Sequence, residues 1–214
     1  MSKEFRRLLL SRAETAQIAL SELLLEKLDR YFELLVRWNQ KVNLTGFDLS
    51  APTPAAIDRM FLEPVAASRF VPANSRAFLD VGSGGGSPAI PLALALGGIR
   101  CVMVESRTRK SVFLVEAART LQLDAQVLTM RYQDVARDPA HHGQYDAVSV
   151  RAVRMDQPEL TALSNVLSPA GLALLFRNDK DSAAYVESDG MAVEGLHSLP
   201  GEGNSQLLVL RKTV

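Results

Sequence analysis

The chain has 214 residues, with 24 basic and 24 acidic side chains and a formal net charge of zero. Balanced charge excludes an overall attraction to nucleic acid or to a membrane surface, so any RNA contact must use a local basic patch. No apolar run approaches the roughly 18 residues of a membrane span, and the first residues lack the apolar core of a signal peptide. With a single cysteine, which fits a reducing compartment, these features predict a cytoplasmic protein without a membrane segment.

The first 45 residues have the apolar periodicity of helices. A long amphipathic helix is predicted from Ser21, a plausible N-cap, to Gly46, a termination signal. Its apolar stripe consists of Leu24, Leu28, Tyr31, Leu34, Leu35, Trp38 and Val42. Because Trp38 belongs to this stripe, we expect it to pack the helix on the core rather than to stack on a base.

A second helix is predicted from Thr53 and Pro54, an N-cap followed by proline at the first helical position. It is expected to run as far as Pro64, where the missing backbone N–H kinks or ends it. A different pattern, of alternating strands and helices, begins soon after. We therefore expect residues 1–70 to form a helical cap packed on an α/β domain of residues 71–214.

Alternating strands and helices after residue 76 are the signature of a mostly parallel sheet with helices on both faces. Strands are expected at Ala77–Val81, Arg100–Val104, Ala125–Met130, Tyr145–Val150, Leu172–Phe176 and Gln206–Arg211. Helices are expected at Pro88–Leu96, Lys110–Leu121 and Pro158–Leu167. Cys101 lies in the second strand and is expected to be a small buried core residue. The predicted fold is a doubly wound, Rossmann-like α/β sheet with an N-terminal helical cap.

A glycine-rich turn follows the first predicted strand, at the edge where open α/β sheets bind ligands. Its sequence is Asp80-Val81-Gly82-Ser83-Gly84-Gly85-Gly86-Ser87-Pro88. Glycines let the backbone turn sharply and approach a ligand without an intervening Cβ. Ser87 and Pro88 are expected to cap and start the following helix. A phosphate-binding P-loop is excluded, because Lys-Ser or Lys-Thr would have to follow the last glycine.

Two ligands remain possible for this turn. A dinucleotide-binding turn has glycine or alanine at the sixth position of its motif, where this chain has Ser87, although its two early glycines match. S-adenosylmethionine (SAM) places its methionine end against such a turn, and its ribose needs a carboxylate on the next strand. Glu105 ends that strand and can accept from two ribose hydroxyls, and Asp80 would orient the turn near the methionine ammonium. These carboxylates favour SAM over NAD; the alternative for Glu105 is a solvated charge.

Several motifs occur along the chain in a characteristic order. They are Trp38-Asn39 with Asn43-Leu44-Thr45, the stretch Phe78–Pro91 around the glycine turn, Glu105-Ser106-Arg107 with Arg109-Lys110 and Phe113-Leu114, and Val150-Arg151-Ala152. In order and spacing they resemble the RsmG (GidB) family of 16S ribosomal RNA guanine-N7 methyltransferases. The resemblance implies a SAM-dependent enzyme that methylates guanine N7 of 16S rRNA, within the 30S subunit or its precursor. We expect a monomer.

Carried over by position, the resemblance implies cofactor contacts at the glycine turn, near the adenine and at the end of the fourth strand. The expected cofactor-binding residues are Asp80, Gly82, Ser83, Gly84, Gly86, Ser87, Glu105, Ser106, Tyr132, Gln133 and Arg151. RNA contacts are expected at Arg109, Lys110, Arg154 and Arg177. As alternatives, Tyr132 covers the sheet edge, and Arg151 pairs with Glu105 or Asp146 as part of the scaffold. Asn39 and Asn43 are expected to brace the cap.

Three segments depart from the family pattern. Met60–Pro64 stands where the family has His-x-x-Asp-Ser, Arg177-Asn178 where it has lysine-glycine, and Gln133 where it has an acidic residue. The cofactor-binding half of the site therefore matches the family pattern well, whereas the substrate-binding half departs from it. This leaves two alternatives open: a SAM-binding relic that acts as a ribosome- or RNA-binding module, and a paralogue that methylates another substrate.

No acid–base catalytic residue is assigned. Guanine N7 already carries a lone pair and loses no proton, so holding it in line, about 3 Å from the methyl group, can supply much of the catalysis. The end of the fourth strand, Ser149–Ala152, lacks the Asn/Asp-Pro-Pro-Tyr pattern that resembles amino-group methyltransferases. His141 and His142 are adjacent, point apart and have no cysteine partner, so no metal site is expected.

Overall fold

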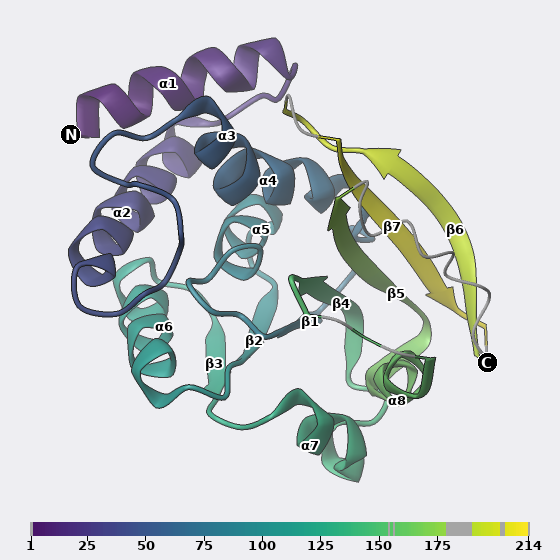
Figure 1. Ribbon diagram of the computed structural model, residues 1–214. Coiled ribbons are helices and arrows are strands. Elements are labelled where there is room, and N and C mark those ends of the chain that lie inside the picture. Colours follow the sequence, from purple (N-terminus) through teal and green to yellow (C-terminus); the bar gives the residue numbers. More distant parts are fainter. Residues whose placement is uncertain (1, 154, 156, 179–189, 202–203, 214) are drawn as a thin grey trace.

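The computed structural model describes residues 2–153, 155, 157–178, 190–201 and 204–213. These residues form a seven-stranded sheet in the order β3-β2-β1-β4-β5-β7-β6 (Figure 1). The strands are β1 (Ala77–Val81), β2 (Arg100–Val104), β3 (Ala125–Leu128), β4 (Tyr145–Arg151), β5 (Leu167–Asn178), β6 (Met191–Ser198) and β7 (Ser205–Lys212). Strands β1 to β5 are parallel, β7 is antiparallel to β5, and β6 is antiparallel to β7.

Crossover helices cover both faces of this sheet, as the sequence predicted. They are α5 (Ala89–Leu96), α6 (Thr108–Thr120), α7 (Tyr132–Arg137) and α8 (Gln157–Val166). Figure 1 shows α5 and α6 on the side of the N-terminal helices, and α7 and α8 on the other side. Successive residues of a central strand point to opposite faces, so Phe78 joins the apolar cluster under α5 and α6 and Leu79 joins the cluster under α7 and α8. Cys101 is fully buried in β2, as predicted.

The N-terminal helices pack on the α5 and α6 side of the sheet (Figure 1). They are α1 (Ser2–Thr15), α2 (Glu22–Asn39), α3 (Pro54–Ile57), a π-helical turn (Asp58–Leu62), α4 (Glu63–Ala67) and a 3₁₀ turn (Ser68–Phe70). Residues on both sides of position 70 share one apolar cluster. Trp38 meets Phe113 of α6 edge-to-face at 5.8 Å between ring centroids, which confirms its predicted role in packing the helix on the core.

Helix α2 begins as predicted and ends earlier than predicted. Its N-cap Ser21 accepts a hydrogen bond from the Leu24 N–H at 3.2 Å. The helix ends at Asn39 instead of near Gly46, because the Asn39 Oδ1 accepts the N–H groups of Leu44 and Thr45 and turns the chain back. Asn39 thus braces the cap, as predicted.

The second helix does not end at Pro64, since helical backbone continues from Pro54 to Ala67. A π-helical turn precedes the proline, and the Glu63 N–H bonds to the Asp58 carbonyl across five residues. Pro64 then stands in the first turn of α4, and the carbonyl four residues before it, that of Met60, accepts the Ser87 hydroxyl instead. No helix among the described residues is long and apolar enough to cross a membrane.

Candidate functional site at the carboxyl edge of the sheet

The glycine turn leaves β1 at the carboxyl edge of the parallel strands. The Ser83 N–H bonds to the Val104 carbonyl of β2 at 3.0 Å, and the Gly86 N–H bonds to the Ser83 carbonyl at 2.6 Å. Gly86 has a φ of +88°, and a Cβ there would lie 2.5 Å from the Ile90 Cδ1. The turn is therefore tightly wound, and the positive φ at Gly86 favours glycine there.

The cap directly braces this turn. The Tyr31 hydroxyl of α2 donates to the Gly85 carbonyl at 2.6 Å, and burial raises the pKa of Tyr31 well above its usual value, so the phenol stays neutral. A Cβ on Gly85 would lie only 2.8 Å from the Leu44 carbonyl oxygen. Residues 31 and 44, both in the cap, thus hold the turn from one side.

Gly85→Ala is expected to lower the free energy of unfolding by about 1–3 kcal/mol and to weaken SAM binding, because the new methyl group forces apart two backbone segments. Thermal unfolding and a calorimetric SAM titration would measure both effects. Gly46→Ala is the matched control, since a Cβ there meets nothing within 4 Å. Equal unfolding temperatures for the two variants would contradict the proposed close packing.

Asp80 places a buried carboxylate under the turn. Its side chain is fully buried, and its Oδ1 accepts the Ser149 hydroxyl at 2.5 Å. Its Oδ2 is also buried and has no hydrogen-bond partner among the described residues. Burial raises the pKa of Asp80 to about 6. Buried polar atoms are normally satisfied, so this oxygen fits a ligand that brings a donor, and a cationic donor best.

Glu105 follows β2 and faces the same turn. Its side chain is buried, its Oε2 accepts the Gly84 N–H at 2.9 Å, and its Oε1 accepts the Arg107 N–H at 2.8 Å. The alternative of a solvated charge is therefore wrong. Each carboxylate oxygen keeps further lone-pair capacity for ribose hydroxyls. Ser106, the next residue, is exposed.

The predicted adenine contacts follow β3 at the same edge. Tyr132 begins α7 and packs half-buried against the apolar cluster under α7 and α8. Gln133 donates from its Nε2 to the Glu159 Oε1 at 3.1 Å and so links α7 to α8. Glu105, Tyr132 and Gln133 thus lie along adjacent strand ends of one sheet edge.

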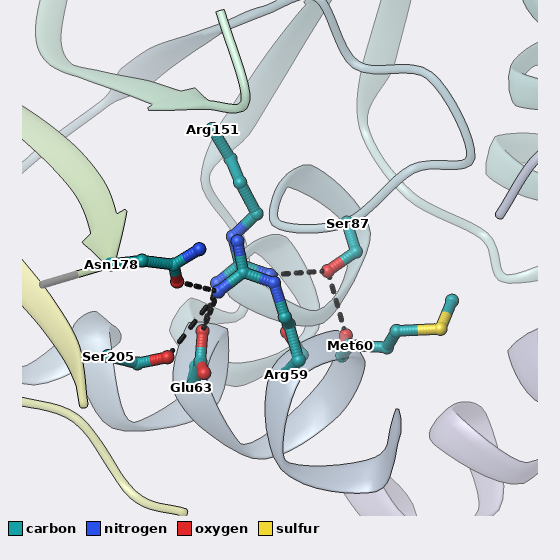
Figure 2. A network of polar contacts seen from close by, with 7 residues as sticks. All are labelled: Arg59, Met60, Glu63, Ser87, Arg151, Asn178 and Ser205. Atoms are coloured by element: carbon teal, nitrogen blue, oxygen red, sulfur yellow. Dashed lines mark hydrogen bonds and ion pairs between the residues drawn. The ribbon is translucent and has the colours of Figure 1, made fainter. Parts of the chain in front are cut away.

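Arg151, the last residue of β4, lies at the centre of a buried polar network (Figure 2). Its guanidinium donates to the Glu63 Oε2 at 2.8 Å, to the Ser87 hydroxyl at 3.1 Å and to the Arg59 carbonyl, and it lies over the Phe176 ring at 4.2 Å. The ion-pair partner is therefore Glu63, so the alternative in which Arg151 pairs with Glu105 or Asp146 is wrong as to the partner. The Arg151 Nε is buried without a partner among the described residues.

Ser87 belongs to this network and does not cap α5. Its hydroxyl donates to the Met60 carbonyl at 2.9 Å, and α5 begins at Ala89 without a side-chain cap (Figure 2). The expectation that Ser87 caps and Pro88 starts the helix is corrected accordingly: Pro88 is the N-cap residue.

The two segments that depart most from the family pattern meet in the same network. Glu63, from the Met60–Pro64 segment, pairs with Arg151, and the neighbouring Arg59 donates to the Asn178 Oδ1 at 2.9 Å (Figure 2). Glu63 and Asn178, one from each segment, therefore belong to one connected network beside the glycine turn. The sequence did not predict Tyr31, Arg59 or Glu63 as site residues.

Burial dominates the electrostatics of the Arg151–Glu63 pair. Desolvation raises the pKa of Glu63 in spite of the opposing charge of Arg151. Desolvation likewise lowers the pKa of Arg151 to about 10, against the attraction of Glu63. Both shifts mean that removing the two charges from water costs more than their attraction returns.

The predicted RNA contacts are not gathered at one place. Arg109 and Lys110 lie in the first turn of α6, after β2, whereas Arg177 lies in β5, on the far side of β1 and β4. Arg154 lies outside the described residues. The histidines His141 and His142 point to different partners, the Tyr145 hydroxyl at 2.7 Å and the Ala136 carbonyl at 3.1 Å. The described part of the chain contains no cluster of three metal-ligating side chains.

The sheet order and the carboxyl-edge site define the class, a SAM-dependent methyltransferase fold. An O-methyltransferase from Bacillus cereus in complex with SAH matches with a TM-score of 0.63 and 16% identity, over 86% of this chain and 91% of that chain. A SAM-dependent methyltransferase from Aquifex aeolicus matches with a TM-score of 0.57 and 16% identity, over 76% and 94%. These likenesses confirm the predicted fold.

Sequence comparison gives the family. The family described as rRNA small subunit methyltransferase G matches residues 24–198. Relatives of that name are 31% identical in Halorhodospira halophila, over 98% of both chains, and 30% identical in Chloroflexus aggregans, over 99% of this chain and 92% of that one. The chain belongs to this methyltransferase family, as its motifs predicted. Family and fold confirm SAM as the cofactor over the dinucleotide that the glycine turn also allowed.

Proposed function

We propose that this protein transfers a methyl group from SAM to guanine N7 of 16S rRNA in the 30S subunit or its precursor. The observation that carries the proposal is the family match over residues 24–198, which includes the glycine turn, Glu105 and Arg151. Residues 1–70 would act as the cap of the methyltransferase domain of residues 71–214. The enzyme would act as a cytoplasmic monomer without a metal ion.

The buried carboxylates at the carboxyl edge support binding of the cofactor there. The unpartnered Asp80 Oδ2 would accept from the methionine ammonium, and Glu105 would accept from the ribose hydroxyls. Tyr132 and Gln133 would lie beside the adenine. The Arg151 Nε has no acceptor among the described residues and would be available to contact the cofactor. Two carboxylates at one edge favour a cationic ligand.

When bound, the cofactor supplies an electrophilic methyl group on a sulfonium. Guanine N7 would form the new bond with its own lone pair while the methyl carbon–sulfur bond breaks and S-adenosylhomocysteine leaves. Since N7 loses no proton, the chain has to hold both reactants in line rather than remove a proton. Tyr31 and Ser87 fix the glycine turn from the cap and from the Arg151 network. Arg109, Lys110 and Arg177 would contact the RNA.

Incubation of the protein with labelled SAM and under-methylated 30S subunits tests the proposal. Label at guanine N7 of 16S rRNA supports it, and fully methylated subunits are the matched control. SAM binding without transfer would indicate a relic, and label in another RNA or small molecule would indicate a paralogue. Calorimetric binding of NADH instead of SAM would overturn the cofactor assignment.

A further inference from the structure

We propose that a groove between the end of α2 and the start of α6 binds phosphate groups of the substrate RNA, beside the target nucleotide. The groove has a volume of about 330 Å³. Its polar lining consists of Lys41, Asn43, Arg107, Thr108, Arg109 and Lys110. The inference rests on the proposed function, because that function supplies the RNA.

The charge of the groove is one-sided. Four cationic side chains line it, and no carboxylate does. None of the four forms an ion pair with a carboxylate of the described residues, whereas arginines elsewhere are paired, as in Arg37–Glu116 and Arg211–Glu194. In a chain with no net charge, this is a local concentration of positive charge that is free to meet an anion. Backbone phosphates are the anions that RNA presents.

The start of α6 adds neutral donors to these charges. Arg107 is the N-cap of this 13-residue helix, and its side chain makes no capping hydrogen bond. The first turn of α6 therefore has no side-chain cap of its own, although the Glu105 carboxylate accepts the Arg107 N–H just before it. The Asn43 amide and the Thr108 hydroxyl, both exposed, can donate to further phosphate oxygens.

The groove borders the cofactor edge. The Lys110 Nζ lies 3.9 Å from the place that a Cβ on Gly84 would occupy, and the Leu44 carbonyl lies against Gly85. The Arg107 N–H donates to Glu105, the predicted ribose ligand. An RNA strand whose phosphates occupy this groove therefore passes next to the cofactor, and a nearby nucleotide can reach the methyl group. The groove would set the position of the strand and not the identity of the base.

The double variant Lys41→Gln/Arg109→Gln tests the groove. Lys110 is left unchanged because it approaches the glycine turn. We expect roughly tenfold weaker binding to under-methylated 30S subunits at low salt, and a slope of log K against log salt reduced by about 1.5 to 2, as for two lost phosphate contacts. SAM affinity by calorimetry should stay unchanged, and KM for the subunit should rise while kcat is kept.

Arg30→Gln/Arg119→Gln is the matched control. It removes two positive charges from exposed positions of the same two helices, outside the groove, and should keep the wild-type salt slope. If the two double variants have equal salt slopes and equal KM values, the groove does not bind RNA. Label transfer by the wild type would in that case still support the proposed function. If Lys41→Gln/Arg109→Gln binds RNA as the wild type does but no longer binds polyglutamate, the groove binds an acidic peptide and the RNA proposal is wrong. Absence of label transfer by the wild type would overturn the proposed function itself.

Discussion

Glu63→Gln is expected to lower the free energy of unfolding by about 3–5 kcal/mol, since it leaves the Arg151 guanidinium buried without a counter-charge. The side chains of Glu63 and Arg151 are only 3% and 7% exposed, and Arg59 brings a second positive charge to within 3.8 Å of the Glu63 Oε2. Loss of the carboxylate therefore leaves the buried Arg151 guanidinium beside the partly exposed Arg59 with no negative charge between them. Urea unfolding followed by circular dichroism would measure the change.

A double-mutant cycle separates this pairing from a general loss of packing. Arg151→Met should also be strongly destabilising, but Glu63→Gln/Arg151→Met should cost clearly less than the sum, because it leaves no buried charge unpaired. Glu194→Gln is the matched control. It breaks the exposed pair with Arg211, where both side chains are about 40% exposed, and should cost less than about 1 kcal/mol. Strict additivity in the cycle would show that the two groups are not coupled.

The central strands were predictable because their buried residues are adjacent in the sequence. Strands β1 and β2 have the predicted bounds, since both faces are buried and each strand is apolar except for Asp80 in β1 and Arg100 in β2. Edge strand β6 was missed. Its half-exposed sequence Met191–Ser198 lacks such a run, and the strand forms by pairing with β7. The short helix α7 was missed as well, because six residues carry too little periodicity.

The same distinction applies to the site. The sequence identified Asp80 from its place just before the glycine turn, and Glu105 from its place at the end of the next strand. Tyr31 contacts Gly85 across 54 positions, and Glu63 pairs with Arg151 across 88. No local pattern connects such residues, and only the packing of the cap on the sheet brings them together. The segment around Met60, which looked like an altered substrate half, proved to be scaffold for Arg151 and Ser87.

Asp80→Asn is expected to weaken SAM binding roughly 10- to 100-fold, which corresponds to the loss of a charge-assisted hydrogen bond of about 1.5–3 kcal/mol. The substitution is nearly isosteric, and the amide oxygen can still accept the Ser149 hydroxyl, so the turn should keep its shape. Loss of the charge should not lower the free energy of unfolding. The folded-state pKa of Asp80, about 6, lies above its ordinary value, so ionisation of this group lowers stability as the pH rises through that range.

The pH dependence of binding distinguishes Asp80 from a general effect on the site. An ammonium group prefers the ionised carboxylate, so SAM affinity of the wild type should rise from pH 5 to pH 7 and level off above, as Asp80 loses its proton near pH 6. Asp80→Asn should remove most of this slope. Asp146→Asn, at the opposite end of the sheet, is the matched control and should keep it. If Asp80→Asn keeps the wild-type dependence of SAM affinity on pH, another group accepts from the ammonium. The unpartnered Asp80 Oδ2 would then have to accept from a different donor.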